Sequence, residues 1–243
     1  TTGNTDIAGT LDVGEDATIN GQVVGKGGGS QIANTAVGID TLFANTTGNH
    51  NSAFGSSSLR YNETGSRNVA TGHSALNKNI SGGYNVATGS NALFQNVDGS
   101  YNTASGYYSL FNTNAGYNTA FGYKAGTINT TGSNNTYIGA NADADTGLTD
   151  LSYSTAIGYD AKVTASNQIM LGTATESVVI PGDASFNSNL NVGGNITVLG
   201  ALDLDGDVSL NSKLFVANDI SVNSISIGIG GGDIPTNTVV GNN

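Results

Sequence analysis

Apolar and polar positions follow a strict six-residue period between Val178 and Val222. Each period places two apolar residues on either side of one other residue, and three mostly small or polar residues follow. Alternation over three positions predicts a short strand, and the small residues predict a corner. The apolar pairs are Val178/Ile180, Ala184/Phe186, Leu190/Val192, Ile196/Val198, Leu202/Leu204, Val208/Leu210, Leu214/Val216 and Ile220/Val222.

Two structures fit this hexad pattern. One is a triangular β-solenoid folded from a single chain, with three hexads in each coil. The other is a triple β-helix, in which each of three chains supplies one side of the triangle. Eight hexads make fewer than three coils in one chain, close to the minimum for a stable solenoid. We therefore favour an intertwined β-helix, or β-prism, for residues 178–229.

A longer repeat precedes the hexads, from Asn34 to about Gly139. Its unit approximates Asn-x-Ala-x-Gly-x-x-Ser/Ala-Leu-x-x-Asn-x-x-Gly-x-x, and successive copies are 17, 17, 17, 17, 16 and 17 residues apart. Ala, Gly and Leu recur in fixed columns, as at Ala87, Gly89 and Leu93, and the unit degrades beyond Gly139. The copies start at Asn34, Asn51, Asn68, Asn85, Asn102, Asn118 and Asn135.

A fixed period of this length indicates stacked coils, in which each unit covers the apolar face of its neighbour. The alternation in Asn-x-Ala-x-Gly predicts a strand of about five residues, and the glycines predict turns. Each unit is therefore expected to be one coil of strand, turn, strand and turn, with stacked coils about 4.8 Å apart. We expect the Ala and Leu columns to face inward and the Asn residues to form ladders between coils. The predicted fold class is all-β, a parallel β-roll or β-solenoid.

The longer repeat resembles the head repeat of YadA-like trimeric autotransporter adhesins, and similar repeats in phage and virus tail-fibre proteins. The resemblance covers residues 34–172 and is carried by three segments. It implies a parallel β-roll and a homotrimer with three chains side by side. The segments are Asn51-Ser-Ala-Phe-Gly55, Asn118-Thr-Ala-Phe-Gly-Tyr-Lys-Ala125 and Ser154-Thr-Ala-Ile-Gly-Tyr-Asp-Ala161.

The two ends of the chain add further modules to this scheme. The hexad spacing recurs at Leu11/Val13, Ala17/Ile19 and Val23, so residues 1–29 are predicted to form an N-terminal hexad β-module with a Gly-rich hinge. Residues 30–177 would be the head, residues 178–229 the hexad stalk, and residues 230–243 a Gly-rich exit linker and tail. No polar capping unit is recognisable at either end, which favours end-to-end assembly into filaments. The tail, with Val239 and Val240, is expected to complete a neighbour's sheet.

Composition and charge exclude several kinds of site and disfavour several kinds of partner. The chain has no Cys, which excludes disulfides and Cys-ligated zinc sites. Eighteen acidic and seven basic residues give a net charge of −11, which disfavours nucleic acids and anionic membrane surfaces as partners. The sequence predicts no membrane-inserted helix, because no apolar run approaches about 18 residues. Thirty-six glycines suit a narrow coil of small side chains.

Several groups of residues could form a metal, catalytic or glycosylation site, or could have a structural role only. Asp203-Leu-Asp205-Gly-Asp207 and Asp143-Ala-Asp145 are similar to the start of a calcium loop, but neither has the later Glu and flanking helices of an EF-hand. His50 and His73 lack a partner at metal or triad spacing. We therefore predict turns at the Asp clusters, and no metal, cofactor or catalytic site. Four of the Asn-x-Ser/Thr sequons share one turn column, which favours turn chemistry over glycosylation. The sequons are Asn45, Asn62, Asn79, Asn129, Asn134 and Asn195.

Tyrosines form two further columns. One precedes the repeat Asn, and the other follows the repeat Gly. Stacked aromatic columns either bind a glycan or seal the contact between protomers. The columns are Tyr84, Tyr101 and Tyr117, and Tyr107, Tyr123 and Tyr159.

The repeats as a whole favour a structural protein rather than an enzyme. The expected function is a rigid trimeric β-rod in an extracellular appendage, a surface filament or a viral tail fibre. The alternative is an adhesin head that recognises a host glycan or a matrix protein. A polysaccharide-degrading solenoid enzyme would need a cleft with clustered acids, which the sequence does not predict.

Overall fold

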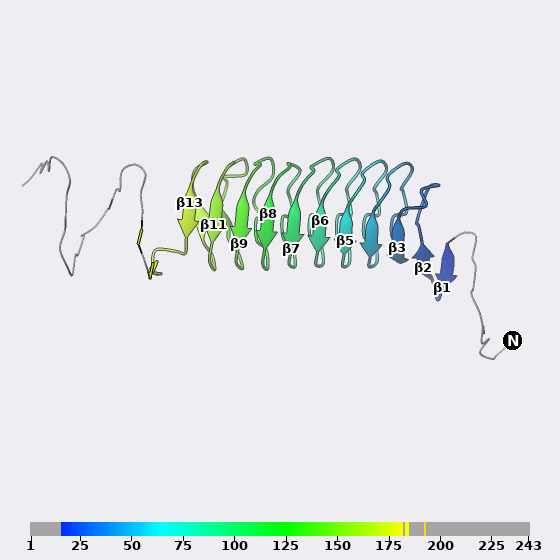
Figure 1. The fold of residues 1–243 in the computed structure, drawn as a ribbon, viewed down its shortest axis with the longest axis horizontal. Coiled ribbons are helices and arrows are strands. Elements are labelled where there is room, and N and C mark those ends of the chain that lie inside the picture. Colours follow the sequence, from blue (N-terminus) through cyan, green and yellow to red (C-terminus); the bar gives the residue numbers. More distant parts are fainter. Residues whose placement is uncertain (1–15, 182, 185–191, 193–243) are drawn as a thin grey trace, which may run out of the picture. The chain divides into compact units, whose positions relative to one another are not determined.

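The computed structural model describes residues 16–181, 183–184 and 192. The chain divides into two units, residues 1–183 and 184–243, and almost all of the described residues belong to the first. Every regular element among them is a β-strand, as predicted (Figure 1). None of the described segments is a helix that could cross a membrane. Most of the predicted hexad stalk and the whole tail lie outside the described residues.

Nine short strands form the parallel part of one sheet, and they are paired in chain order. Figure 1 shows them side by side in one row, each connected to the next by a loop around the coil. They are β3 (Thr35–Gly38), β4 (Ser52–Phe54), β5 (Val69–Thr71), β6 (Val86–Thr88), β7 (Thr103–Ser105), β8 (Thr119–Phe121), β9 (Thr136–Ile138), β11 (Thr155–Ile157) and β13 (Ile169–Leu171).

The register between neighbouring strands follows the sequence repeat. Ala36 pairs with Ala53, and the same column continues to Ala120, which pairs with Tyr137. The strands start at residues 35, 52, 69, 86, 103, 119, 136, 155 and 169. The regular coils therefore contain 16 or 17 residues, and the last two contain 19 and 14. The degraded repeats beyond Gly139 still build coils, because β9, β11 and β13 pair in parallel.

The core of this stack consists of the two predicted apolar columns. The Ala residues of the strands and the Leu residues opposite them have no exposed surface. A narrow coil leaves room for a methyl group on the strand side and for a larger side chain on the other side. The inward orientation of both columns is confirmed. Their members are Ala36, Ala53, Ala70, Ala87, Ala104 and Ala120, and Leu42, Leu59, Leu76, Leu93 and Leu110.

The side of each coil that carries the Leu residues differs from the predicted second strand. Only β10 (Asp143–Ala144) and β12 (Lys162–Val163) form a regular strand pair there. In the earlier coils the Leu residue adopts a φ of 47° to 53°, a left-handed conformation that interrupts an extended strand. Hydrogen bonds between coils persist, since Leu59 N–H donates to the Ala75 carbonyl at 3.0 Å. These bonds offset a conformational cost of about 1–2 kcal/mol per left-handed residue.

The glycine that follows each strand permits the closest approach between coils. Gly89 has a φ of 128°, and a Cβ atom built on it would lie 2.6 Å from the carbonyl oxygen of Gly106 in the next coil. The equivalent glycines from Gly38 to Gly139 show the same φ range and the same contact with their successors. The repeat therefore requires glycine here for both conformation and space.

The Asn residues that open the repeats form the first of two buried ladders. Each side-chain oxygen accepts a hydrogen bond from the backbone N–H of the equivalent Asn one coil later, at 2.9–3.0 Å. In most coils the side-chain amide donates to a glycine carbonyl on the far side of its own coil, as Asn68 does to Gly82. One side chain thus joins two coils and also crosses the interior, so the predicted ladder is confirmed.

The second ladder lies in the sequon column. The Asn62 amide donates to the Asn45 oxygen, Asn79 to Asn62, and Asn96 to Asn79, at 2.7–2.9 Å. The ladder stops where Thr113 replaces Asn, and this leaves the Asn96 side-chain oxygen buried without a partner. Buried amides are costly unless they are hydrogen-bonded, so these ladders fix the register of the coils.

An antiparallel hairpin covers the N-terminal end of the stack, where a hexad β-module was predicted. β1 (Ala17–Ile19) pairs with β2 (Gln22–Gly25), and β2 pairs antiparallel with β3. The turn is Asn20-Gly21, with φ values of 52° and 79°. Positive φ at both central residues defines a type I′ turn, which Asn-Gly strongly favours. Ala17, Ile19 and Val23 therefore belong to a hairpin that caps the first coil. Leu11 and Val13 lie outside the described residues.

The glycines that follow the hairpin do not behave as the predicted hinge. Gly28 N–H donates to the Leu42 carbonyl at 2.9 Å, and the Gly28 carbonyl accepts from the Asn45 side chain. A Cβ atom on Gly28 would lie 2.6 Å from the Phe43 carbonyl oxygen. These residues are glycine because the chain lies flat against the backbone of the first coil.

Candidate functional site

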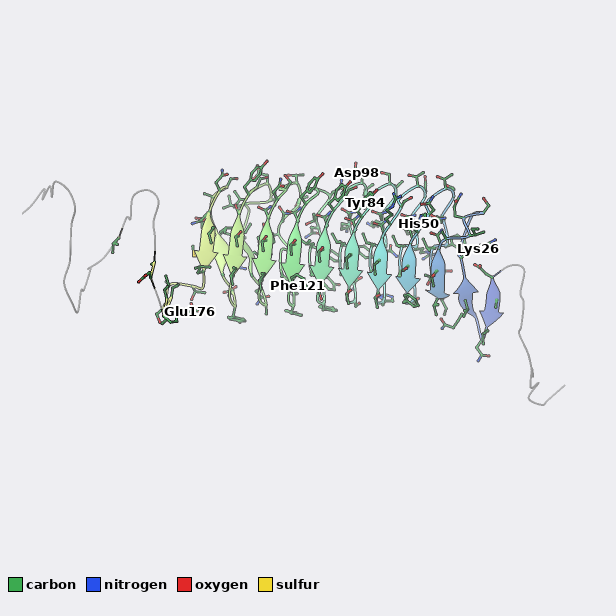
Figure 2. All side chains as sticks on the ribbon, viewed as in Figure 1. Lys26, His50, Tyr84, Asp98, Phe121 and Glu176 are labelled. Atoms are coloured by element: carbon green, nitrogen blue, oxygen red, sulfur yellow. The ribbon has the colours of Figure 1, made fainter. Side chains whose placement is uncertain are left out.

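The first tyrosine column forms a stacked row on the surface of the coils. Tyr84 and Tyr101 have ring centroids 4.8 Å apart, and Tyr101 and Tyr117 are 4.9 Å apart, with planes within 9° of parallel. These three residues are 47–60% exposed. Arg67 covers the free face of Tyr84 and donates to its hydroxyl at 2.8 Å. Figure 2 shows Tyr84 and His50, from the same column, along one edge of the coils.

The second column belongs to a larger cluster. Tyr107 stacks on Tyr123 at 5.7 Å and contacts Tyr108 at 4.4 Å, and Tyr108 stacks on Phe111. Phe111 stacks in turn on Phe94. Lys124 lies over Tyr123 at one end of this row, and Lys78 lies over Phe94 at the other. Desolvation, followed by a hydrogen bond with Tyr108, raises the pKa of Tyr107.

The geometry of both rows favours a stabilising role over a glycan platform. A sugar stacks on the face of an aromatic ring. Here neighbouring rings, or a cation at the end of a row, cover most of the faces, and only the outer face of Tyr117 has no described ring or cation over it. Tyr159 is exposed in the same column as Tyr123 but has no described ring contact. Offset stacking contributes about 0.5–1.5 kcal/mol per pair, which reinforces the stack of coils.

The sequons divide according to burial. Asn45, Asn62, Asn79 and Asn129 are almost fully buried, and their amides donate to backbone carbonyls of the same turn. The prediction of turn chemistry at these four is confirmed. Asn134 is exposed and its amide donates to Ser133, whereas Asn195 lies outside the described residues.

The two candidate calcium ligands in the head, Asp143 and Asp145, do not form a common site. Asp143 is buried, whereas Asp145 is exposed and accepts a hydrogen bond from Thr146 N–H. His50 and His73 are both exposed, and no group of three potential metal ligands occurs among the described residues. The second cluster, Asp203, Asp205 and Asp207, lies outside them, as do Val239 and Val240.

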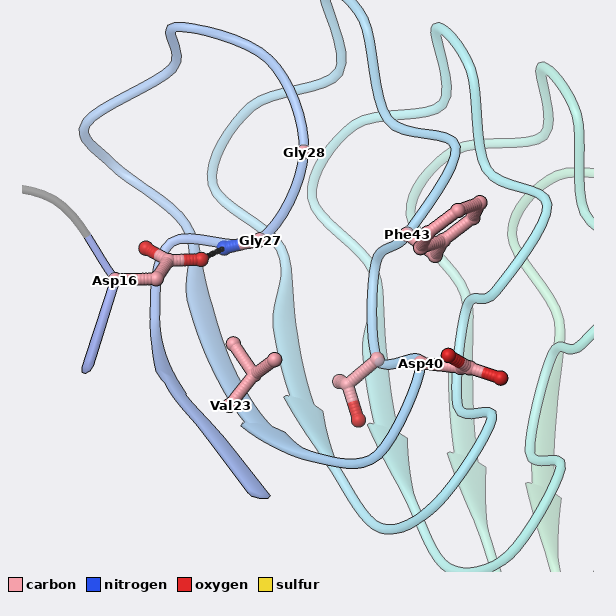
Figure 3. A pocket seen from close by; sticks show the side chains of 7 residues that line it. Asp16, Val23, Gly27, Gly28, Asp40 and Phe43 are labelled. Carbon is pink, nitrogen blue, oxygen red and sulfur yellow. Dashed lines mark hydrogen bonds between the residues drawn. The ribbon is translucent and has the colours of Figure 1, made fainter. Parts of the chain in front are cut away.

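A hollow of about 420 Å³ lies between the hairpin and the first coil (Figure 3). Its walls include Val23 from the hairpin and Phe43 and Asp40 from the coil. The carboxylate of Asp16 accepts hydrogen bonds from the N–H groups of Lys26 and Gly27, at 2.7 and 2.8 Å. Asp16 therefore fixes the start of the Gly-rich segment, and Asp40 pairs with Arg60 at 3.3 Å. Both acidic side chains already have partners, so we interpret this hollow as the boundary where the hairpin packs against the first coil.

The interior contains a polar group that sequence reasoning missed. Tyr137 stands in the Ala column and is fully buried, and its hydroxyl has no hydrogen-bond partner. Its ring fills the space opposite, where Gly126 replaces the usual Leu: a Cβ on Gly126 would lie 2.6 Å from the ring. Burial, and then the charge of Asp143, raise the pKa of the Tyr137 hydroxyl. The signal in the sequence was the pair of exceptions, a large residue and a small one, in adjacent columns.

Comparison of the chain with protein-family models, with curated proteins and with solved structures yields no match.

Proposed function

We propose that this protein is a structural fibre component, whose stacked coils form a rigid rod in an extracellular appendage, a surface filament or a viral tail fibre. The observation that carries this proposal is the unbroken in-register stack from β3 to β13. Each coil covers the apolar face of the one before it, and buried Asn ladders bond successive coils. Such an arrangement resists bending and proteolysis because few backbone groups are free to open locally.

The outward face of the parallel sheet supports a homotrimer of such rods. Along β3 to β13 its outward side chains are Thr, Ser, Val, Phe, Ile and Leu, and none is charged. Phe54, Phe121 and Ile138 are 40–46% exposed on this face, and Val69 and Val86 are 39% exposed. Figure 2 labels Phe121 on one of these strands. A continuous uncharged face of this kind is typical of an interface between subunits.

We expect light scattering to give a mass of three times 24.4 kDa, or a multiple of it. Val86→Lys should lower that mass, because it places a charge at the centre of the proposed interface. The matched control is His50→Lys, which adds the same charge to a loop column that already contains Arg67. Electron micrographs of the trimer should show short rods. A wild-type monomer, or equal masses for Val86→Lys and His50→Lys, would contradict the proposed assembly.

A further inference from the structure

The first tyrosine row stops at Tyr117, although its column continues along the stack. Asn134 takes the next position in the column, and Tyr153 takes the one after it. All three residues share one backbone conformation, with φ values of 62°, 60° and 57°. The hydrogen bonds between coils continue here. Asn134 N–H donates to the Gly116 carbonyl at 3.4 Å, and Tyr153 N–H donates to the Ser133 carbonyl at 3.0 Å. Two tyrosines of one column are therefore separated by a single asparagine.

The space between these tyrosines has the width of one flat ring. Within the row, rings of neighbouring coils lie 4.8 and 4.9 Å apart. Two coils, at about 4.8 Å each, place Tyr153 about 9.6 Å from Tyr117. A ring inserted midway would lie about 4.8 Å from each tyrosine, which is the stacking distance of the row itself. We call this space, between Tyr117 and Tyr153 and above Asn134, the tyrosine slot.

The intervening asparagine leaves the slot open. Its side chain ends at the amide group, closer to the backbone than the outer half of a tyrosine ring. Tyr117 is 60% exposed, whereas Tyr101, with a ring on each face, is 48% exposed. Tyr153 is 63% exposed. Both walls of the slot are therefore accessible to a ligand.

Polar, uncharged groups surround the base of the slot. The Asn134 amide donates to Ser133 Oγ at 3.1 Å, and its side-chain oxygen accepts no hydrogen bond from the described residues. Ser152 Oγ accepts from Ser133 N–H at 3.0 Å. The strands that follow begin with Thr136 and Thr155. The slot thus combines two aromatic walls with an amide and hydroxyl groups, and none of these side chains is charged.

The second tyrosine column contains a similar gap that lacks these properties. Tyr159 lies two coils from Tyr123, with Ala140 between them. Lys124 lies over the Tyr123 ring at 5.2 Å, and Ala140 has no polar side-chain atom. This gap therefore has neither a free aromatic wall on Tyr123 nor a polar base, and it provides an internal control for the tyrosine slot.

We propose that the tyrosine slot binds one pyranose ring of a neutral, gluco-configured sugar between Tyr117 and Tyr153, with Asn134 hydrogen-bonded to the hydroxyl groups of the sugar. Aromatic faces pack against the C–H groups of a sugar ring, and a side-chain amide can both donate to hydroxyl groups and accept from them. A purely aromatic ligand would fill the slot but would leave the amide without a partner. This site does not depend on the fibre proposal.

Two aromatic walls also select the configuration of the sugar. Both faces of the bound ring must present C–H groups, because a hydroxyl group pressed against a tyrosine face loses its hydrogen bonds to water. A β-glucoside carries all of its ring substituents in equatorial positions and presents C–H groups on both faces. A galactoside has an axial hydroxyl group at C4, which would point at one of the two tyrosines.

Saturation-transfer NMR on the intact protein, with methyl β-D-glucopyranoside as the probe, tests the site. Saturation should reach H1, H3 and H5 on one face of the sugar and H2 and H4 on the other to a similar extent. We expect a Kd on the order of 1 mM, as for a single small ligand. Methyl β-D-galactopyranoside should bind roughly fivefold more weakly. Saturation of one face only, or equal binding of the two sugars, would overturn the proposal.

Variants locate the binding on the protein. Tyr117→Ala and Tyr153→Ala should each weaken binding roughly three- to tenfold, whereas Tyr159→Ala should leave it unchanged. Asn134→Tyr keeps every native tyrosine and places a ring in the slot, so it should abolish binding in a protein whose circular dichroism is unchanged. Binding that survives Asn134→Tyr would overturn the proposal. So would a wild-type protein that binds p-cresol but not the glucoside, since the slot would then accept an aromatic ring instead of a sugar.

Discussion

Gly89→Ala is expected to lower the free energy of unfolding by about 3–5 kcal/mol, although it adds only one methyl group. Two effects combine. Gly89 has a φ of 128°, which an Ala residue adopts only with strain, and the new Cβ would lie 2.6 Å from the Gly106 carbonyl oxygen. The atom it meets is backbone, held by the bond from Gly106 N–H to the Thr88 carbonyl, so neither coil has room to adjust. Urea unfolding followed by circular dichroism measures the loss.

Gly147→Ala is the matched control for this experiment. Gly147 has a φ of 87°, but no atom lies within 4 Å of the position that a Cβ would occupy. This variant measures the cost of a positive φ without a steric contact, which should be about 1–2 kcal/mol at this φ. Equal losses for the two variants would show that close contact between coils does not explain the glycine column.

The exchange of large and small residues at Tyr137 and Gly126 should produce a strongly non-additive double-mutant cycle. Tyr137→Ala removes a fully buried ring and should cost about 3–5 kcal/mol. Gly126→Leu places a Cβ 2.6 Å from the Tyr137 ring and 2.7 Å from Leu110 Cδ2, and such overpacking should cost about 1–3 kcal/mol or more. The double variant restores the Ala-and-Leu pair of the other coils, so it should cost less than Tyr137→Ala alone.

The coupling energy measures whether the two positions share one space. We expect at least about 2 kcal/mol between them, at the upper end of values for residues in contact. Ala120→Gly combined with Gly126→Leu serves as the reference cycle, because it leaves the Tyr137 ring in place. If the costs of Tyr137→Ala and Gly126→Leu simply add, the packing described for this coil is wrong.

The sequence predicted the parts of the fold that depend on a period. Ala87 and Leu93 recur at fixed positions, and residues that recur in a stack of coils must occupy the same place in each coil. The Asn ladders follow from the same reasoning, since a buried amide needs a partner and its nearest equivalent lies one coil away.

Features that depend on local geometry were predicted less well. Left-handed φ values at Leu93 and Tyr84 contradict the expectation that glycine marks such positions, because hydrogen bonds between coils outweigh the local preference. The apolar spacing of Ala17, Ile19 and Val23 suits a hexad and a hairpin equally, and Asn20-Gly21 was the signal that distinguished them. The inward position of Asp143 could have been predicted from the period, because it lies eight residues after Asn135, as Leu93 lies eight residues after Asn85, but its acidic side chain favoured a turn in the sequence analysis.

The central claim is that successive repeats stack as parallel coils at a constant spacing. Spin labels on pairs of introduced cysteines test it directly, since the chain contains no Cys, and dilution with unlabelled protein removes contributions between subunits. Phe54 is in register with Phe121 four strands along, with Ile138 five along and with Ile157 six along. Label separations for these three pairs should increase in even steps of about 4.8 Å, from roughly 19 to 24 to 29 Å. Separations that do not increase with the number of intervening repeats would contradict the stacked-coil structure.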